Sequence, residues 1–143
     1  LKSPVKEVID AVGVPLISDS EDIANARLLF ENGCIANVTA SRISAEPMRK
    51  IRIFQPFTYF SLDYAAQAIK CFQLNKAAGT DSSQALLYDE IAVEREEPLR
   101  KEIEAFVSSV RKGATPAVTG TEAREALAAA AWIIEKMRSK TYQ

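Results

Sequence analysis

Cationic side chains punctuate the middle of this 143-residue sequence, and they are the first residues that could do chemistry. The four closest together are Arg42, Arg49, Lys50 and Arg52. A guanidinium group offers a planar fork of N–H donors that fits a phosphate or a carboxylate, so this stretch could grip an anionic ligand. Lys and Arg most often stay exposed, however, and solvated charge at strand ends is the more frequent explanation.

An aromatic cluster surrounds the dipeptide Gln55-Pro56, and it could line a sugar or nucleotide pocket. Its members are Phe54, Phe57, Tyr59, Phe60 and Tyr64. Aromatic residues of strands belong more often to a core or an interface. Asp63 could serve as an acid or base, but no partner carboxylate or histidine stands at a meaningful spacing from it.

The sequence contains no histidine, which excludes a Ser–His–Asp triad, a Cys–His pair and a His-ligated metal within the chain. Acidic clusters at residues 19–22, 89–90 and 94–97 lack the alternating ligands and turn glycine of a calcium loop. The loop around Gly79 lacks the glycines and Lys-Ser/Thr pair of a phosphate cradle. We therefore predict no catalytic, cofactor-binding or metal-binding residue in this chain.

The net charge and the cysteines limit which partners and which cellular compartment we expect. With 18 Lys+Arg against 19 Asp+Glu, the formal net charge is −1, which argues against nucleic acid or an anionic membrane as a partner. No apolar run approaches the roughly 18 residues of a membrane span. Cys34 and Cys71 lie in apolar, strand-like stretches outside any C-x-x-C motif, so we expect reduced thiols in a cytoplasmic protein, although a disulfide stays open.

Strand patterns fill the first two-thirds of the chain. Alternating or β-branched stretches predict strands over Val5–Val14, Ile23–Phe30, Cys34–Ile43, Lys50–Gln55, Thr58–Tyr64, Ala66–Leu74 and Leu86–Arg95. Asn32-Gly33 predicts a hairpin with a type I′ turn. Pro56 predicts a bend, and residues 76–84 a polar, mobile loop.

Two helices are predicted in the last third. Glu96-Glu97-Pro98 is a start signal, and Lys112-Gly113 is a stop. The second helix begins near residues 119–121, capped either by Thr119, which has capping-box spacing to Glu122, or by Thr121. The predicted apolar stripes are Leu99, Ile103, Phe106, Val107 and Val110, and then Ala123, Leu127, Ala130, Ile134 and Met137.

This order of elements predicts an α+β fold with an open, mostly antiparallel sheet of about six strands and helices packed on one face. By size, residues 1–143 suit a single domain. The alternating strands leave a second, half-apolar sheet face, which a symmetric copy or another domain usually covers.

Three stretches resemble, in order and spacing, the C-terminal domain of the Gfo/Idh/MocA oxidoreductases, the glucose-fructose oxidoreductase and inositol dehydrogenase superfamily. They are EDIANARLLFENGCIANVTASRIS, RKIRIFQPFTYFSLDY and EPLRKEIEAFVSSVRKGATPAVTGTEAREALAAA. The resemblance runs from about Ser3 to Met137. The ASRIS and RIFQP stretches look most like members that oxidise the 3-position of UDP-N-acetylglucosamine-type sugars.

The resemblance implies that a full-length member carries an N-terminal Rossmann domain for NAD or NADP, a Glu-Lys-Pro lysine and an Asp-x-x-x-His motif. None of these occurs here, and Leu1-Lys2-Ser3-Pro4 reads like a cut inside a longer protein. The family's sheet domain forms one wall of the sugar pocket and assembles through its exposed face. By this resemblance, Arg42 and Gln55 are the candidate substrate-binding residues, and no catalytic or cofactor residue can be carried over.

We therefore expect a substrate-wall and assembly domain of an NAD(P)-dependent sugar or sugar-nucleotide dehydrogenase, inactive alone and without a cofactor of its own. Its expected partners are a second copy, its own Rossmann domain and the substrate. The alternative is a stand-alone dimeric β-sheet module that binds a ligand or protein without redox chemistry.

Overall fold

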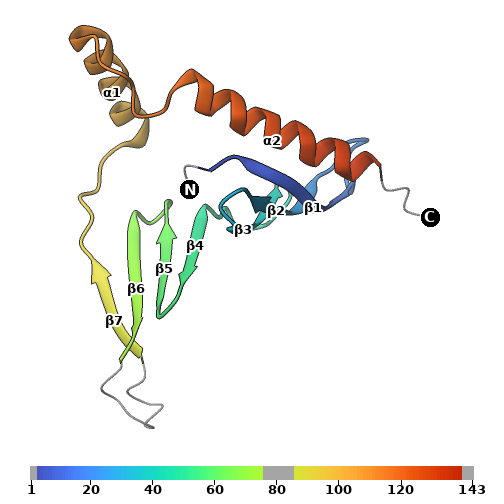
Figure 1. The fold of residues 1–143 in the computed structure, drawn as a ribbon, viewed down its shortest axis with the longest axis horizontal. Coiled ribbons are helices and arrows are strands. Elements are labelled where there is room, and N and C mark those ends of the chain that lie inside the picture. The colour runs from blue at the N-terminus through green and yellow to red at the C-terminus, as the bar shows by residue number, and fades with distance from the viewer. Residues whose placement is uncertain (1–2, 76–85, 140–143) are drawn as a thin grey trace. The chain divides into compact units, whose positions relative to one another are not determined.

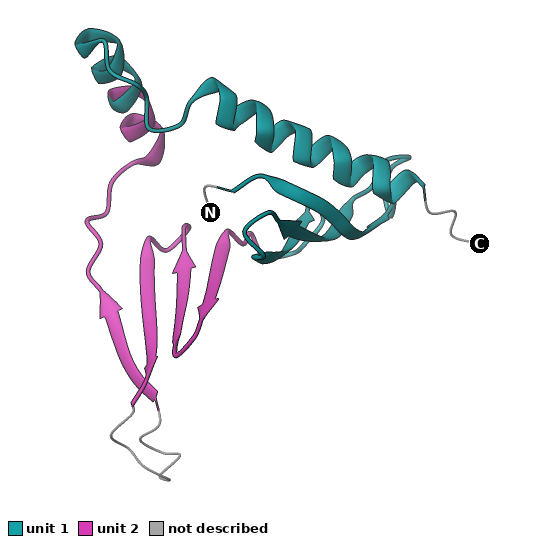
Figure 2. Cartoon of the chain, viewed as in Figure 1, with its two compact units in different colours: residues 1–45, 105–143 teal, residues 46–104 magenta. Residues whose placement is uncertain are grey.

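The computed structural model describes residues 3–75 and 86–139 of the chain (Figure 1). The chain divides into two compact units (Figure 2). Unit 1 comprises residues 1–45 and 105–143, and unit 2 comprises residues 46–104.

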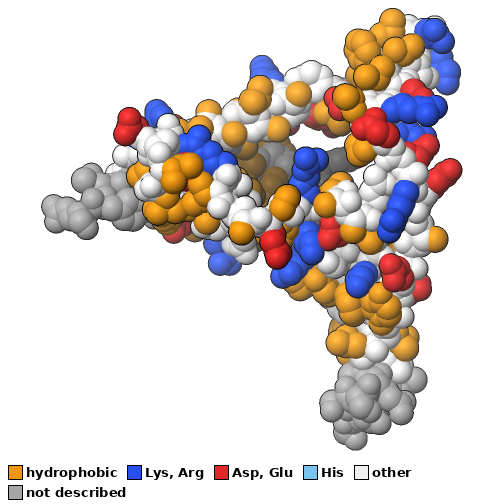
Figure 3. Space-filling view, turned by 180° about the vertical axis from the view of Figure 1, so that it is seen from behind, with side chains coloured by type: hydrophobic (Ala, Val, Ile, Leu, Met, Phe, Trp, Pro, Cys, Tyr) orange, Lys and Arg blue, Asp and Glu red, His pale blue; other side chains and the backbone are white. Residues whose placement is uncertain are grey.

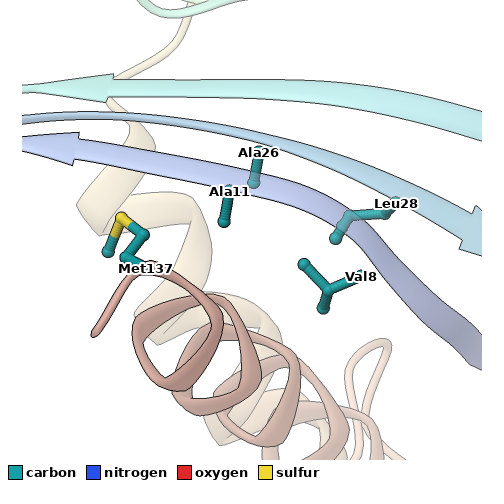
Figure 4. Close-up of a cluster of buried hydrophobic side chains, with 5 residues drawn as sticks. All are labelled: Val8, Ala11, Ala26, Leu28 and Met137. Carbon is teal, nitrogen blue, oxygen red and sulfur yellow. The ribbon is translucent and has the colours of Figure 1, made fainter. Parts of the chain in front are cut away.

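Unit 1 is a three-stranded antiparallel sheet packed against a helix. The sheet order is β1 (Val5–Val14), β2 (Ile23–Phe30) and β3 (Ile35–Ser41), and α2 (Gly120–Arg138) packs on β1. The buried core lies between sheet and helix and consists of Val8, Ala11, Ala26, Leu28 and Met137 (Figure 4). In β2, the buried Ala26 and Leu28 follow the alternation predicted from the sequence. In β1, a register shift between Val8 and Asp10 brings Val8 and Ala11, three residues apart, to the same face against α2.

The β2–β3 hairpin is confirmed, but its predicted type I′ turn is wrong. A type I′ turn needs positive φ at both central residues, and of the pair Asn32-Gly33 only Gly33 has it, with a φ of 82°. The Gly33 amide donates to the Phe30 carbonyl at 2.9 Å, and Leu29 is paired with Ile35. The connection is thus one residue longer than expected, a turn followed by a left-handed glycine. The Asn32 side chain accepts from the Cys34 amide at 3.0 Å and fixes the tip.

Unit 2 is built on a four-stranded antiparallel sheet in chain order. Its strands are β4 (Lys50–Gln55), β5 (Thr58–Asp63), β6 (Ala68–Leu74) and β7 (Leu86–Ile91). The bend predicted at Pro56 is a two-residue hairpin turn, in which Gln55 pairs with Thr58 and Phe57 takes a φ of 64°. Proline fixes the first turn position, which leaves Phe57 in the left-handed conformation that glycine usually occupies.

Both helices begin and end where local signals place them. In α1 (Pro98–Lys112), the Glu97 carboxylate accepts from the Leu99 and Arg100 amides, and Gly113 ends the helix with a φ of 59°. The cap of α2 is Thr119, which forms the predicted capping box with Glu122.

The predicted apolar stripe of α2 coincides only partly with its buried face. Met137 is 6% exposed and Ile133 packs against the core, whereas Leu127 and Ile134 of the predicted stripe are 72% and 41% exposed. The stripe of α1 also lies on the surface, and no described residue of α1 is buried (Figure 3).

The α+β class with open, antiparallel strands is confirmed. The strands form two hydrogen-bonded sheets where we expected one of about six strands, since β3 and β4, joined by residues 42–49, do not pair with each other. The loop predicted to be mobile, residues 76–84, lies outside the described residues. Within the described part of the chain, no helix is long and apolar enough to cross a membrane.

Candidate functional site

The two predicted substrate-binding residues lie in different units. Arg42 follows β3 in unit 1, and Gln55 ends β4 in unit 2 beside the Pro56-Phe57 turn. Both residues are exposed. Each environment is therefore described separately.

Arg42 forms an ion pair with the buried carboxylate of Asp22, a member of the acidic cluster at residues 19–22 to which we assigned no role from the sequence. Asp22 is 2% exposed, and its Oδ2 accepts from the Leu16 and Ile17 amides, both at 2.7 Å. Its Oδ1 accepts from Arg42 Nε at 2.5 Å, and Arg42 Nη2 donates to the Ser18 hydroxyl. Arg42 thus closes the β1–β2 connection against the end of β3.

The same contacts decide the protonation state of Asp22. The two backbone N–H donors, and after them the Arg42 guanidinium, hold the pKa of the Asp22 carboxyl well below its usual range. The carboxylate is therefore ionised at neutral pH and compensates one edge of the guanidinium. The Arg42 side chain remains 54% exposed, so part of its fork still faces solvent.

An aromatic row crosses the four-stranded sheet of unit 2, one ring from each strand. The ring centroids of Phe54 and Tyr59 are 4.7 Å apart, those of Tyr59 and Phe72 5.1 Å, and those of Phe72 and Tyr88 5.2 Å. The first two pairs are stacked, with interplanar angles of 9° and 19°. Tyr59 therefore has a neighbouring ring stacked on each of its faces, whereas Phe54 at the end of the row is 74% exposed.

The predicted aromatic cluster is therefore only partly assembled. Phe54 and Tyr59 are neighbours, and Phe72 and Tyr88 complete the row although the sequence analysis did not group them with it. Phe60 lies on the opposite face of β5, because successive residues of a strand alternate. The missing signal was the strand register, which sequence spacing alone does not reveal.

Charged side chains run beside the aromatic row on the same face. Lys50 Nζ lies 3.0 Å from Asp63 Oδ2, Lys70 Nζ lies 5.9 Å from the Tyr88 ring centroid, and the Tyr88 hydroxyl lies 3.1 Å from Glu90 Oε2. We call this the aromatic face. Register and alternation assign to it Lys50, Arg52, Phe54, Tyr59, Ser61, Asp63, Ala68, Lys70, Phe72, Leu74, Leu86, Tyr88 and Glu90.

Asp63 has a structural role on this face. Its Oδ1 accepts from the Ala65 and Ala66 amides at 3.1 and 3.0 Å, which closes the β5–β6 turn. The Ala66 amide and then Lys50 lower the pKa of the Asp63 carboxyl. A lowered pKa makes Asp63 a poor general acid at neutral pH.

The other side of the same sheet differs in character. Its hydrophobic members form what we call the isoleucine face: Ile51, Ile53, Phe60, Leu62, Ile69, Cys71, Leu87 and Ile91. Cys71 is 5% exposed, and its single charged neighbour on this side is Asp89 on β7. Both Cys34 and Cys71 are free thiols, as predicted.

A shallow pocket of about 480 Å³ lies between the β5–β6 turn and the segment before α1. The Gln67 side chain spans it, donating from Nε2 to the Glu96 carbonyl at 2.7 Å and accepting at Oε1 from the Glu96 amide at 2.9 Å. These paired bonds fasten the two segments together. Among the described residues, no cluster of three or more His, Cys, Asp or Glu could hold a metal ion.

Known proteins resemble this chain both in sequence and in structure. No family model matches the sequence. The chain is 32% identical over 123 residues to a UDP-N-acetylglucosamine 3-dehydrogenase of Acidithiobacillus ferrooxidans, which covers 85% of this chain and 39% of that protein. The solved structure of that bacterium's enzyme superposes with a TM-score of 0.83 at 26% identity, over 96% of this chain and 42% of the other. The sequence and the structure of this chain thus match a Gfo/Idh/MocA oxidoreductase.

The chain spans about two fifths of the length of the relative it matches. The aldose-aldose oxidoreductase of Caulobacter crescentus shares the fold, with a TM-score of 0.71 and 21% identity over 96% of this chain and 40% of that one. The resemblance inferred from the three sequence stretches is thereby confirmed, for the family and for the partial coverage.

Proposed function

We propose that this chain is the C-terminal substrate-wall and assembly domain of an NAD(P)-dependent sugar or sugar-nucleotide dehydrogenase, and that it is inactive in isolation. The observation that carries the proposal is its 32% identity to a UDP-N-acetylglucosamine 3-dehydrogenase. NAD or NADP would be held by the Rossmann domain of the full-length protein. Residues 1–143 would act as one domain beside it, and the free thiols support a cytoplasmic location.

The substrate wall would include Arg42 and Gln55. Arg42 keeps exposed guanidinium donors while Asp22 holds its Nε edge, so the group is pre-oriented toward an anionic ligand. Gln55 offers an exposed amide next to a rigid proline turn. A sugar diphosphate presents hydroxyl and phosphate oxygens that suit these two donors.

The test compares the 143-residue chain with the same chain joined to its Rossmann domain. Given UDP-N-acetylglucosamine and NAD⁺ or NADP⁺, the isolated chain should form no reduced nicotinamide, measured by absorbance, and the joined protein should. In the joined protein, Arg42→Lys and Gln55→Ala should raise KM, while the exposed control Lys6→Ala should not. Stoichiometric nicotinamide reduction by the isolated chain would contradict the proposal.

A stand-alone dimeric β-sheet module that binds a ligand or protein without redox activity is the second candidate. The exposed aromatic face of β4–β7 favours it, since unpartnered faces of this kind usually bind something. The reading frame upstream of Leu1 separates the two candidates. A glycine-rich Rossmann fingerprint there supports the dehydrogenase domain, and a start codon directly before Leu1 supports the module.

A further inference from the structure

We propose that Asn32, at the tip of the β2–β3 hairpin, is a site of spontaneous covalent modification in the folded protein. Its side-chain amide is converted to a carboxylate, with the backbone nitrogen of Gly33 as the attacking group and water as the co-reactant. The reaction uses only the hairpin tip and is independent of the dehydrogenase function proposed above.

Water alone balances the reaction. The Gly33 nitrogen forms a bond to Cγ of Asn32, the Cγ–Nδ2 bond breaks, and Nδ2 leaves as ammonia with the proton that the Gly33 nitrogen has lost. The product is a cyclic succinimide. Water then opens the ring, either at the Cγ–N bond to give aspartate or at the main-chain carbonyl carbon of residue 32 to give isoaspartate. Nothing is oxidised or reduced.

The residue that follows each asparagine decides which one reacts. Of the four asparagines in the chain, only Asn32 precedes a glycine. A side chain on the following residue crowds the attacking nitrogen, and glycine has none. Asn25 and Asn37 precede Ala26 and Val38 within β2 and β3, where strand pairing keeps the main chain extended. Sequence and register therefore single out Asn32.

The contacts of the tip favour attack on the Asn32 side chain. Its Oδ1 accepts a hydrogen bond from the Cys34 amide at 3.0 Å. This bond curls the side chain over the peptide that joins Asn32 to Gly33, so the carbonyl carbon lies beside the attacking nitrogen. The same N–H donor stabilises the negative charge that develops on Oδ1 during the attack. Asn32 and Gly33 are both exposed, so water reaches them.

Other bonds of the tip slow the reaction. The Gly33 amide donates to the Phe30 carbonyl at 2.9 Å, and this N–H must be released before the nitrogen can lose its proton. The Asn32 amide donates to Ser3 Oγ at 3.1 Å, so the segment before β1 fastens the tip. The rate is therefore set by local opening of the hairpin tip, which amide hydrogen exchange measures.

The products change the hairpin in charge and in length. Aspartate and isoaspartate each add a negative charge next to Glu31. Isoaspartate also adds an atom to the main chain, in a connection whose length fixes the β2–β3 register. The modification therefore weakens the turn bonds of Gly33 and Cys34 at the start of β3.

The experiment incubates the folded 143-residue chain at mildly alkaline pH and follows the modification by mass spectrometry, with thermal unfolding to verify folding. Tryptic cleavage after Arg27 and Arg42 gives a peptide that carries both Asn32 and Asn37, so Asn37 is a control within the same molecule. Conversion at Asn32 should be at least about tenfold faster than at Asn37. Both aspartate and isoaspartate should appear, because direct hydrolysis by water would give aspartate alone.

The same chain unfolded in urea is the reference for the opening of the tip. Folding should slow conversion at Asn32 by no more than the protection factor of the Gly33 amide, because both reactions need the bond to Phe30 to open. Ser3→Ala removes the acceptor of the Asn32 amide and should speed conversion about two- to tenfold. Ser20→Ala, in the exposed connection between β1 and β2, is the matched control and should leave the rate unchanged.

Equal rates at Asn32 and Asn37, or aspartate without isoaspartate, would overturn the proposal. A folded chain that keeps Asn32 intact while the urea-unfolded chain is converted would also overturn it, because the fold would then block the attack. A Ser3→Ala rate equal to that of the wild type would contradict the control of the reaction by tip opening. None of these outcomes depends on the nicotinamide assay, which tests the proposed function separately.

Discussion

Asp22 shows how one carboxylate can join three segments of unit 1. It accepts from two backbone amides of the β1–β2 connection and from Arg42 after β3. An asparagine in its place can still accept from the amides through its oxygen, but its NH₂ group then faces the Arg42 donor. We expect Asp22→Asn to lower the thermal midpoint by several degrees, with Asp19→Asn in the same exposed turn as the control. Equal midpoints for the two variants would contradict the role given to Asp22.

The lowered pKa of Asp22 also predicts a pH dependence of stability. Below the usual aspartate pKa of about 3.9, Asp22 is protonated in the unfolded chain but still ionised in the folded chain. The stabilisation is therefore complete above that pH and is lost as the pH falls further, through the folded pKa. In thermal scans across this acidic range, the gap between wild type and Asp22→Asn should shrink as the pH decreases. A gap that stays constant would mean that the Asp22 charge contributes nothing.

Gly13 is the residue that allows the end of α2 to approach β1. A Cβ at this position would lie 2.4 Å from Glu21 Cγ and 2.8 Å from Sδ of the buried Met137. Gly13→Ala should therefore reduce the free energy of unfolding by about 1–3 kcal/mol in urea titrations. Gly120→Ala is the matched control, since nothing lies within 4 Å of its added Cβ and it sits in the first turn of α2. A neutral Gly13→Ala would mean that Met137 and Glu21 move aside freely.

At the scale of elements, the bounds of helices and strands could be predicted from local sequence signals, whereas the pairing register of the strands could not. The bounds of β1, β2 and β4 follow from alternation, and both helix starts follow from caps that involve only neighbouring residues. The one-residue error in the β2–β3 turn had a larger consequence. A two-residue Asn-Gly turn would place Asp22 opposite Ile43, whereas the observed longer turn places it opposite Arg42. The contact between Asp22 and the predicted substrate residue Arg42 therefore could not be predicted from the sequence.

The buried face of α2 was less predictable because alanines carry little positional information. Six of the nineteen residues of the helix are alanines, and they fit several faces equally well. The buried face of α2 is determined by its packing on β1, where Ile133 and Met137 near the end of the helix contact the core. The aromatic row across β4–β7 could not be predicted from the sequence either, because it depends on the register of three strand pairings.

The capping box of α2 gives a test at this scale. Thr119 accepts from the Glu122 amide at 3.2 Å, and Glu122 Oε2 accepts from the Thr119 amide at 2.8 Å. Thr119→Ala should cost about 1 kcal/mol of unfolding free energy in urea, because the first turn of α2, which packs on β1, loses its side-chain acceptor. Thr121→Ala removes a hydroxyl from the second residue of the helix, which is not the cap, and should cost less. A larger loss for Thr121→Ala would support the alternative cap that the sequence left open.

At the scale of the whole molecule, burial is distributed unequally between the two units. The core of Val8, Ala11, Ala26, Leu28 and Met137 lies in unit 1. Among the described residues of unit 2, Cys71 is the single buried hydrophobic side chain. A four-stranded sheet needs at least one covered hydrophobic face for independent stability. Unit 2 is therefore expected to depend on a partner surface, and unit 1 is not.

Hydrogen exchange at several protein concentrations tests this difference. On dilution, amides of β4–β7 should exchange faster as the association that covers their sheet is lost, while amides of β1, β2 and α2 should keep their rates. The Asp22→Asn variant provides the reverse control, because it should speed exchange in β1 and β2 without making β4–β7 more sensitive to dilution. Concentration-independent exchange in β4–β7 would show that unit 2 is stable without a second copy. The exposed aromatic face would then have to serve a contact other than self-association, such as one with the remainder of the full-length enzyme.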